Sequence, residues 1–449
     1  MSLVAGAATR DLIPPDSAPL FGYPGVRRMS AGVHDPVLAS ALFLGDPTVQ
    51  GAGAVILALD LLFLDPPVAC QLRAAVARAT ELSEACVFVG YTHAHSSPVC
   101  ARLLAWHGDA GAPEPDPAYL EHVIEQAVAA AAAARLAAVP AALAWTSVEV
   151  HGVGGNRLRA DGPTDPECAI LSVRRATGGE PFASIVVYGM HPTVLHEDSL
   201  LISSDFPHYT RCFVKERFGA DHVCVYLMGP SGDQSPRRFV NGQTFAEAER
   251  LGRNLGSFVV HAMEKLAPGN FQPDAGLAGR LQSVPLPRRT LPAREMAAGD
   301  LEQAERQFAE LQAATAPRAE VRTAECAVFG ARSALNLANA QADGVLDRFM
   351  AEAGVPEIQA LRVGGVTLLG IPGELFVGYS LELKSRAPAP VVPVSLVNGQ
   401  LQGYICTPEA AAAGGYEAAN SLYAPEAGRI LVGAALELIS SPNTNATAP

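Results

Sequence analysis

The stretch Cys86-Val87-Phe88-Val89-Gly90-Tyr91-Thr92-His93-Ala94-His95-Ser96-Ser97-Pro98 joins a short apolar run to a polar turn that carries two histidines. An apolar run bounded by turn residues is typical of a buried strand. In an extended chain, side chains at i and i+2 point to the same side, so His93 and His95 can face one pocket. This spacing suits a metal site, but a pair of hydrogen-bonded histidines explains it equally well.

Four further apolar runs have the length of strands and alternate along the chain with helix-like segments. The runs cover residues 54–59, 185–188, 223–227 and 366–371, and the helical segments cover residues 67–84, 119–136, 208–218 and 245–266. Such alternation favours an α/β fold with mixed β-sheets flanked by helices. We expect the chemistry at the strand ends, because open α/β sheets bind ligands there.

The composition changes between residues 287 and 340, where arginines and glutamates stand among alanines and glutamines and Ala316-Pro317 interrupts the pattern. This is typical of a solvated helical hairpin inserted into the main domain, and we expect no chemistry in it. One catalytic domain is expected over residues 1–439. Residues 440–449 hold no core-forming residue and are expected to be a disordered tail.

The overall composition excludes several classes of protein. Of 449 residues, 49% are hydrophobic, so the chain can bury a large core. The net charge of 32 − 45 = −13 and the lack of a basic cluster argue against nucleic-acid binding. No apolar run reaches the roughly 20 residues that span a bilayer. We expect a cytoplasmic protein without a transmembrane segment, because the N-terminus has no secretory signal and the eight cysteines form no Cys-x-x-Cys pair.

Four more polar constellations supply candidate site residues, and three of them also follow an apolar run. They are His191 in Met190-His191-Pro192-Thr193, Asp233 and Ser235 in the turn 229–236, Glu374 in Pro372-Gly373-Glu374, and the tyrosines Tyr404 and Tyr416. Taken singly, each has a structural explanation as a satisfied histidine, a turn, a helix start or a packed ring. Two histidines and a carboxylate from separate segments form the most economical set, around one divalent metal that assists hydrolysis.

In their order along the chain, these motifs resemble the catalytic domain of the neutral/alkaline, non-lysosomal ceramidases, which are zinc-dependent amidases that cleave N-acyl sphingosines. Any one motif would be weak, but they are collinear over almost the whole chain. They are Arg10-Asp11-Leu12-Ile13-Pro14, Phe21-Gly22-Tyr23, Thr92-His93-Ala94-His95-Ser96, Asn156-Arg157, His191-Pro192-Thr193, Gly232-Asp233-Gln234-Ser235-Pro236, Pro372-Gly373-Glu374, and Gly403-Tyr404 through Tyr416-Glu417.

The resemblance implies a role for each matching residue. The implied zinc ligands are His93, His191, Glu374 and Tyr404, with a water completing the sphere. The groups implied around the scissile carbonyl are His95, Arg157 and Tyr416. Asp233 and Ser235 match a Gly-Asp-x-Ser-Pro motif, and we expect Ser235 to contact a substrate hydroxyl, since metal-bound hydroxide makes a serine nucleophile unnecessary.

Three departures from the family pattern bear on the substrate. Ala94 and Ser97 replace a threonine and a glycine, and Arg237-Arg238 stands where an asparagine is usual. The immunoglobulin-like C-terminal domain of the classical enzymes is also expected to be missing. These departures indicate a substrate other than membrane ceramide.

The sequence therefore predicts an amidohydrolase with one Zn²⁺ per chain that cleaves an N-acyl bond in a small or lipid-like amide, by attack of metal-bound hydroxide. An esterase or lactonase that uses the same site is a second interpretation. A non-catalytic zinc-binding accessory protein is a third. Whether Asp35 and Asp60 hold a second divalent cation is left open.

Overall fold

Two β-sheets form the centre of the protein, seen in a computed structural model that describes residues 3–23, 25–46, 48–49, 51–109 and 113–441. The larger sheet has the strand order β11-β9-β8-β6-β1-β3-β4-β5 and the smaller has the order β13-β14-β15-β17. The strands of the larger sheet are β1 (Val4–Asp11), β3 (Leu38–Gly45), β4 (Gly53–Leu59), β5 (Val87–Tyr91), β6 (Val139–Glu149), β8 (Glu167–Arg175), β9 (Pro181–Tyr188) and β11 (Val223–Met228). Those of the smaller sheet are β13 (Leu277–Ser283), β14 (Glu357–Val363), β15 (Val366–Ile371) and β17 (Val391–Ser395).

Each strand alternates its side chains between two faces of its sheet. The side chains on the inner faces of both sheets pack together in one apolar core. Ile56 of β4, Phe88 of β5, Leu227 of β11 and Leu368 of β15 belong to this core. The two ends of the larger sheet therefore fold toward each other instead of lying flat. A Cβ placed on Gly90 of β5 would come within 2.7 Å of the Leu227 side chain, which shows how closely these ends approach.

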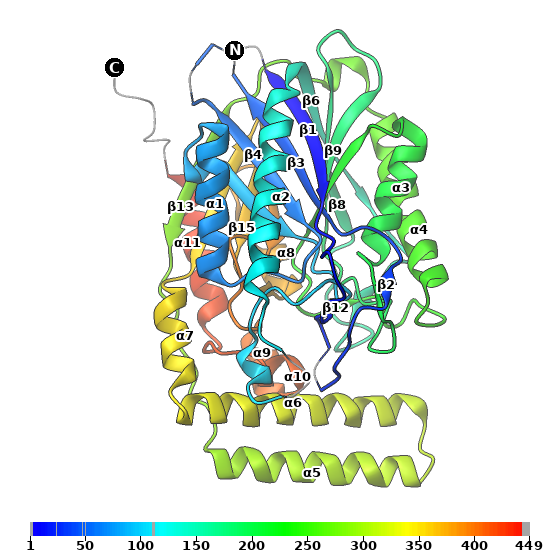
Figure 1. Ribbon diagram of the computed structural model, residues 1–449, viewed down its shortest axis with the longest axis vertical. Coiled ribbons are helices and arrows are strands. Elements are labelled where there is room, and N and C mark those ends of the chain that lie inside the picture. The colour runs from blue at the N-terminus through cyan, green and yellow to red at the C-terminus, as the bar shows by residue number, and fades with distance from the viewer. Residues whose placement is uncertain (1–2, 24, 47, 50, 110–112, 442–449) are drawn as a thin grey trace.

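Helices cover the outer faces of the sheets, as Figure 1 shows. Helices α1 (Pro66–Thr80) and α2 (Pro117–Leu136) cover the end with β3, β4 and β5, and α3 (Phe206–Phe218) and α4 (Phe245–Glu264) cover the end with β9 and β11. Helices α8 (Val377–Arg386) and α11 (Ala427–Ser440) cover the smaller sheet. The predicted class, an α/β protein with mixed sheets flanked by helices, is confirmed.

The predicted helical hairpin is formed by α5 (Arg294–Ala313) and α6 (Arg318–Ala342), which pack against each other. Figure 1 shows both helices lying across one end of the protein, beside α10 (Tyr416–Ala419). Gly330 of α6 permits this approach, since a Cβ there would lie 3.2 Å from the Cα of Tyr416. The hairpin, where we expected no chemistry, therefore contacts a predicted site residue.

The structure bears on two further predictions, the disordered tail over residues 440–449 and the lack of a transmembrane segment. Ser440 of the predicted tail is the last residue of α11, and residues 442–449 lie outside the described residues. Within the described ranges, no helix combines the length and the apolar character that crossing a membrane requires.

Candidate metal centre

His93 lies just beyond β5, in a turn with unusual backbone geometry. The backbone N–H of Thr92 still donates to Leu59 O of β4, but His93 has a φ of 63°, in the left-handed region. For a residue other than glycine this conformation costs roughly 1–3 kcal/mol and is found where surrounding contacts hold it. His95 therefore joins His93 through a turn, and not through the extended i and i+2 geometry expected from the sequence.

The ring of His93 is buried and oriented by the backbone. Its Nδ1 lies 3.1 Å from the carbonyl oxygen of Leu62. A carbonyl only accepts hydrogen bonds, so Nδ1 carries the proton. The other ring nitrogen, Nε2, is then the atom that can offer a lone pair to a metal ion.

His191 follows β9 and is held in the same way. Its Nδ1 lies 2.7 Å from Ser231 O and 3.1 Å from Gln234 O, two carbonyls of the turn after β11. Burial, followed by the charge of Arg157, lowers the pKa of His191 to about 4. At neutral pH the ring therefore has no second proton, and its Nε2 also presents a lone pair.

Glu374 brings a third acceptor to the same point. It lies in β16 (Glu374–Leu375), and its Oε2 is 2.9 Å from His191 Nε2 and 3.5 Å from His93 Nε2, while the two nitrogens are 3.2 Å apart. Burial raises the pKa of Glu374, but the two histidines outweigh it and hold that pKa well below its ordinary value. Two ring nitrogens and a carboxylate oxygen, all buried, thus converge within 3.5 Å of one another, and a divalent cation could be bound by their lone pairs.

His95 adds a fourth lone pair beside these three. Its Nδ1 lies 2.9 Å from Gly22 O, and its Nε2 is buried without a hydrogen-bond partner among the described residues. Ligand atoms of His93, His95 and His191 all lie within 4.8 Å of one another, so these three rings could hold a metal ion. Burial and then the neighbouring rings lower the pKa of His95 well below its ordinary value, so it is neutral.

Arg157 supplies the positive group of the site. It follows β7 (Gly155–Asn156), is buried, and donates from Nε to Glu417 Oε1 at 2.7 Å. Burial opposes its charge, but Tyr404 and Glu417 outweigh that cost and raise the pKa of Arg157 well above its ordinary value. Its Nη2 is buried and has no partner among the described residues, which leaves one oriented donor free.

The two predicted tyrosines lie together beside Arg157. Tyr404 begins β18 (Tyr404–Ile405), which pairs with β16 so that Tyr404 is opposite Glu374. Its ring is 5.1 Å from the Arg157 Cζ and 5.9 Å from the ring of Tyr416. Burial raises the pKa of both tyrosines, so both carry their protons in the absence of a cation.

Asp233 and Ser235 lie at the same end, where β12 (Gln234–Ser235) pairs with β7. Both oxygens of Asp233 are used by the protein, since Oδ1 accepts from Val377 N at 2.9 Å and Oδ2 from Asn156 Nδ2 at 3.0 Å. Asp233 therefore links its turn to the start of α8 and to β7 by hydrogen bonds. The structure thus brings every predicted site residue to one region, and Ser235 and Asp233 lie at its margin.

Comparison with known proteins gives a match only at the level of structure. No protein-family model matches the chain, and no curated protein matches it. A crystal structure of neutral ceramidase from Pseudomonas aeruginosa matches with a TM-score of 0.74 and 19% identity, covering 100% of this chain and 76% of that one. The protein has the neutral ceramidase fold. A structure described as ceramidase complexed with C2 matches with a TM-score of 0.71 and 16% identity, over 98% of this chain and 75% of that one.

The neutral ceramidase fold confirms the resemblance drawn from the motifs as far as architecture is concerned. The structure also brings Glu417, a residue without a role in the sequence-based prediction, into the candidate centre. Glu417 is buried and pairs with Arg157, 260 positions earlier in the chain. A signal was present, because a glutamate next to a candidate site tyrosine and inside an apolar segment needs a cation when buried.

The open question of a second cation is answered by another arginine. Arg211 holds both oxygens of Asp60, with two contacts of 2.7 Å. Asp35 accepts from Ser203 Oγ at 2.6 Å and from Ser204 N at 2.9 Å. A guanidinium therefore already neutralises Asp60, and within the part of the chain that the structure describes the group of possible metal ligands includes neither Asp60 nor Asp35.

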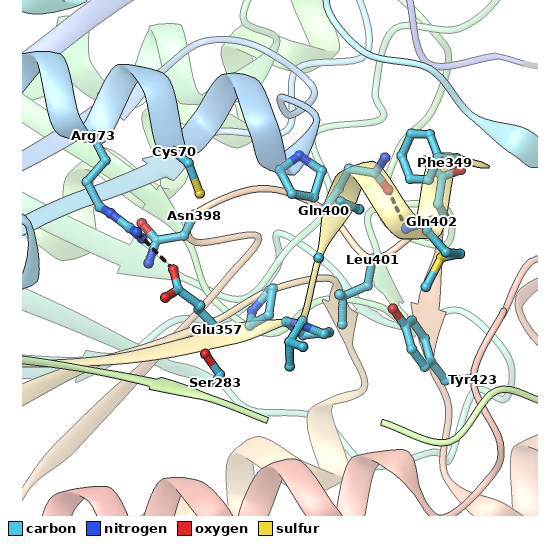
Figure 2. Close-up of a pocket in the computed structure, with 17 residues that line it drawn as sticks. Cys70, Arg73, Ser283, Phe349, Glu357, Asn398, Gln400, Leu401, Gln402 and Tyr423 are labelled. Atoms are coloured by element: carbon cyan, nitrogen blue, oxygen red, sulfur yellow. Dashed lines mark hydrogen bonds and ion pairs between the residues drawn. The ribbon is translucent and has the colours of Figure 1, made fainter. Parts of the chain in front are cut away.

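A separate cavity of about 380 Å³ lies outside the histidine cluster, and Figure 2 shows its lining. Arg73 and Glu357 form an ion pair of 2.9 Å at one side, and Phe349, Leu401 and Tyr423 line the other. None of the predicted site residues lines this cavity. The cavity and the histidine cluster are therefore separate regions of the protein.

Proposed function

We propose that the protein is a zinc-dependent amidohydrolase that cleaves an N-acyl bond, with residues 1–439 as its catalytic domain. The observation that carries this proposal is the convergence of His93 Nε2, His191 Nε2 and Glu374 Oε2, three buried atoms of metal-ligating type within 3.5 Å of one another. Two histidines and a glutamate are a typical ligand set for catalytic zinc. The fold shared with proteins named ceramidase supports an amide as the bond that is cleaved.

The proposed ligands are His93, His191, Glu374 and Tyr404. Both histidines already have the second contact that orients a ligand, since each Nδ1 donates to a backbone carbonyl. Tyr404 lies opposite Glu374 in the paired strands and would have to lose its proton to bind as an anion. When bound, zinc supplies Lewis acidity and brings the pKa of water from about 15.7 to about 7.

Arg157 is proposed to stabilise the oxygen of the scissile carbonyl. Its Nη2 is a buried donor without a partner among the described residues, while its Nε is fixed by Glu417. A donor held in place before the reaction stabilises the negative charge that develops on that oxygen. Tyr416, whose hydroxyl keeps its proton, is proposed as the second donor.

His95 is proposed to move the proton. Because its Nδ1–H donates to Gly22 O, only Nε2 is available, and Nε2 is an acceptor. It can take a proton from the attacking water and return it to the amine nitrogen as the C–N bond breaks. This role is consistent with the position around the scissile carbonyl that the resemblance implies for His95.

The substrate is proposed to be a small or lipid-like N-acyl amide. Ser235 is proposed to contact a substrate hydroxyl, and Asp233 is a positioning residue because both of its oxygens are used by the protein. The cytoplasmic location expected from the sequence stays a prediction.

Substitution of Glu374 by glutamine tests the proposal. The variant keeps the size of the side chain but removes its charge, so we expect loss of bound zinc and a fall in kcat of about 10³-fold or more. Zinc per chain is measured by elemental mass spectrometry, and hydrolysis by the paired appearance of acid and amine from a panel of N-acyl amides. Glu437→Gln, on the exposed side of α11, is the matched control.

Three outcomes contradict the proposal in different ways. Only trace zinc in active wild-type protein, with Glu374→Gln equally active, rules out the metal mechanism. Faster turnover of matched esters than of amides makes the protein an esterase. A full zinc content with no turnover of any substrate in the panel favours a non-catalytic zinc protein.

A further inference from the structure

Arg237 and Arg238 are consecutive but have different surroundings. Arg238 donates from Nη1 to the backbone oxygen of Asn156, so its side chain supports the turn. Arg237 is exposed, and its backbone N–H donates to Ser235 Oγ at 3.3 Å. Among the described residues, no carboxylate lies within ion-pair distance of the Arg237 guanidinium.

The neighbouring charged groups are already compensated. Arg157 is paired with Glu417 at 2.7 Å, and Arg322 of α6 is paired with Glu325. Although Arg237 is exposed, the side chains around it partly desolvate the guanidinium and lower its pKa, while Cys326 and Glu417 offset part of this effect. Arg237 is thus a positive group at the margin of the candidate centre, beside two other guanidinium groups and without a counter-ion of its own.

The charge of the whole protein makes this local cation more significant. With a net charge of −13, the protein repels an anion at long range. An anionic substrate would therefore need a positive group close to the centre. A planar guanidinium with free donors suits a carboxylate, which it can bind with two parallel hydrogen bonds.

We propose that Arg237 binds an anionic group of the substrate, so that the substrate class is an N-acyl amide that carries a carboxylate near the scissile bond. This inference rests on the proposed amidohydrolase function and specifies its substrate. Arg237 is then a specificity-determining residue, and it takes no part in bond cleavage. The carboxylate can belong to the amine part or to the acyl part, and the experiment separates these two sources.

The experiment uses three amides of matched size and the zinc-loaded full-length protein. One amide is neutral, one carries a carboxylate on the amine part, and one carries a carboxylate on the acyl part. We expect the wild type to prefer one of the anionic amides by about tenfold in kcat/KM. Arg237→Gln should abolish this preference, mainly through KM, and Arg237→Lys should restore part of it, because lysine keeps the charge but not the planar fork.

Arg362→Gln is the matched control, since it removes one exposed arginine from β14 and should leave the preference intact. Raising the salt concentration should weaken the preference, because Arg237 is exposed and its charge is screened. A preference for the neutral amide, or a preference for an anionic amide that survives in Arg237→Gln, overturns the inference.

The failure of the proposed function gives a different result. In that case none of the amides is cleaved, and calorimetric titration of the same three amides still tests Arg237. Tighter binding of an anionic amide to the wild type than to Arg237→Gln supports the inference. Equal binding to both proteins overturns it.

Discussion

Two buried clusters of charged and polar side chains differ in how their acceptors are satisfied. In the cluster around Asp60, Arg211 donates to both carboxylate oxygens, and the neighbouring Asp35 accepts from two serines. In the candidate metal centre, His93, His191 and Glu374 direct acceptors at one another. The first cluster is neutralised within the chain, whereas the second offers ligand atoms that a cation could bind.

This contrast shows why burial of charge alone does not identify a functional site. Desolvation costs several kcal/mol per ion in either cluster and must be offset by partners. The partners of Asp60 belong to the chain, so they serve stability. In the centre, two histidines and a glutamate converge instead, and this set of side chains suits a divalent cation.

Removal of Arg211 should break the complete cluster and produce the largest effect on stability. Arg211→Met leaves Asp60 buried and unpaired, and we expect the free energy of unfolding to fall by about 3–5 kcal/mol. Denaturant titration measures this loss, and elemental analysis should still find one zinc per chain. The double variant Asp60→Leu with Arg211→Met should recover part of the loss, because it removes the unpaired charge as well.

A comparison of the single and double variants decides between the two descriptions of this cluster. A double variant that is destabilised by the sum of both single effects would show that Asp60 and Arg211 do not stabilise each other. A second metal bound by the wild type, and lost in Asp60→Leu, would show that the cluster is incomplete after all.

Substitution of Arg157 tests the candidate metal centre. Arg157→Lys retains the charge next to Glu417 but loses the fixed Nη2 donor, so we expect kcat to fall by about 10²–10³-fold while zinc content is unchanged. The melting temperature is measured in parallel, to separate catalysis from stability. A variant with unchanged kcat and a raised KM would assign Arg157 to substrate binding instead.

The sequence predicts several strands from their apolar runs but leaves others unpredicted, including β17 with its three valines. Residues 54–59 and 223–227 were expected as strands and correspond to β4 and β11. The runs in β1 and β3 are not singled out, because alanine and glycine give only a weak hydrophobic periodicity, whether that of a strand or that of a helix. Strands such as β1 and β3, which pair with each other in antiparallel orientation, are recognised only when their pairing in the folded protein is known.

The motifs predict which residues lie together in the candidate centre, but not the geometry in which they lie. The motifs named His93 and His191, yet their orientation depends on carbonyls of Leu62 and Ser231, 31 and 40 positions away. The left-handed turn at His93 likewise has only a weak local signal, since histidine adopts this conformation more often than most residues but still rarely. Contacts between distant segments therefore decide the chemistry that local motifs only suggest.

The smallest predicted effect concerns another buried histidine, His222. It shows that a histidine can have a lowered pKa without being a metal ligand. Burial lowers its pKa to about 4, the value also found for His191, but its Nε2 faces Ser184 Oγ at 2.9 Å and its Nδ1 lies 2.9 Å from Pro181 O. A hydroxyl can donate to Nε2, so this ring is satisfied as a neutral group. We expect it to affect stability and not zinc content.

The sign of the pH effect follows from the lowered pKa. The unfolded chain takes up a proton on this residue near pH 6.5, whereas the folded protein does so only near pH 4, so the stabilising contribution is complete above about 6.5 and is lost as the pH falls toward 4. Between pH 7 and pH 5, the wild type should lose about 2 kcal/mol more of unfolding free energy than His222→Gln. The exposed His151→Gln is the control and should behave as the wild type does. Equal pH dependence in wild type and His222→Gln would contradict this prediction, and zinc loss in His222→Gln would remove the distinction between a satisfied histidine and a ligand.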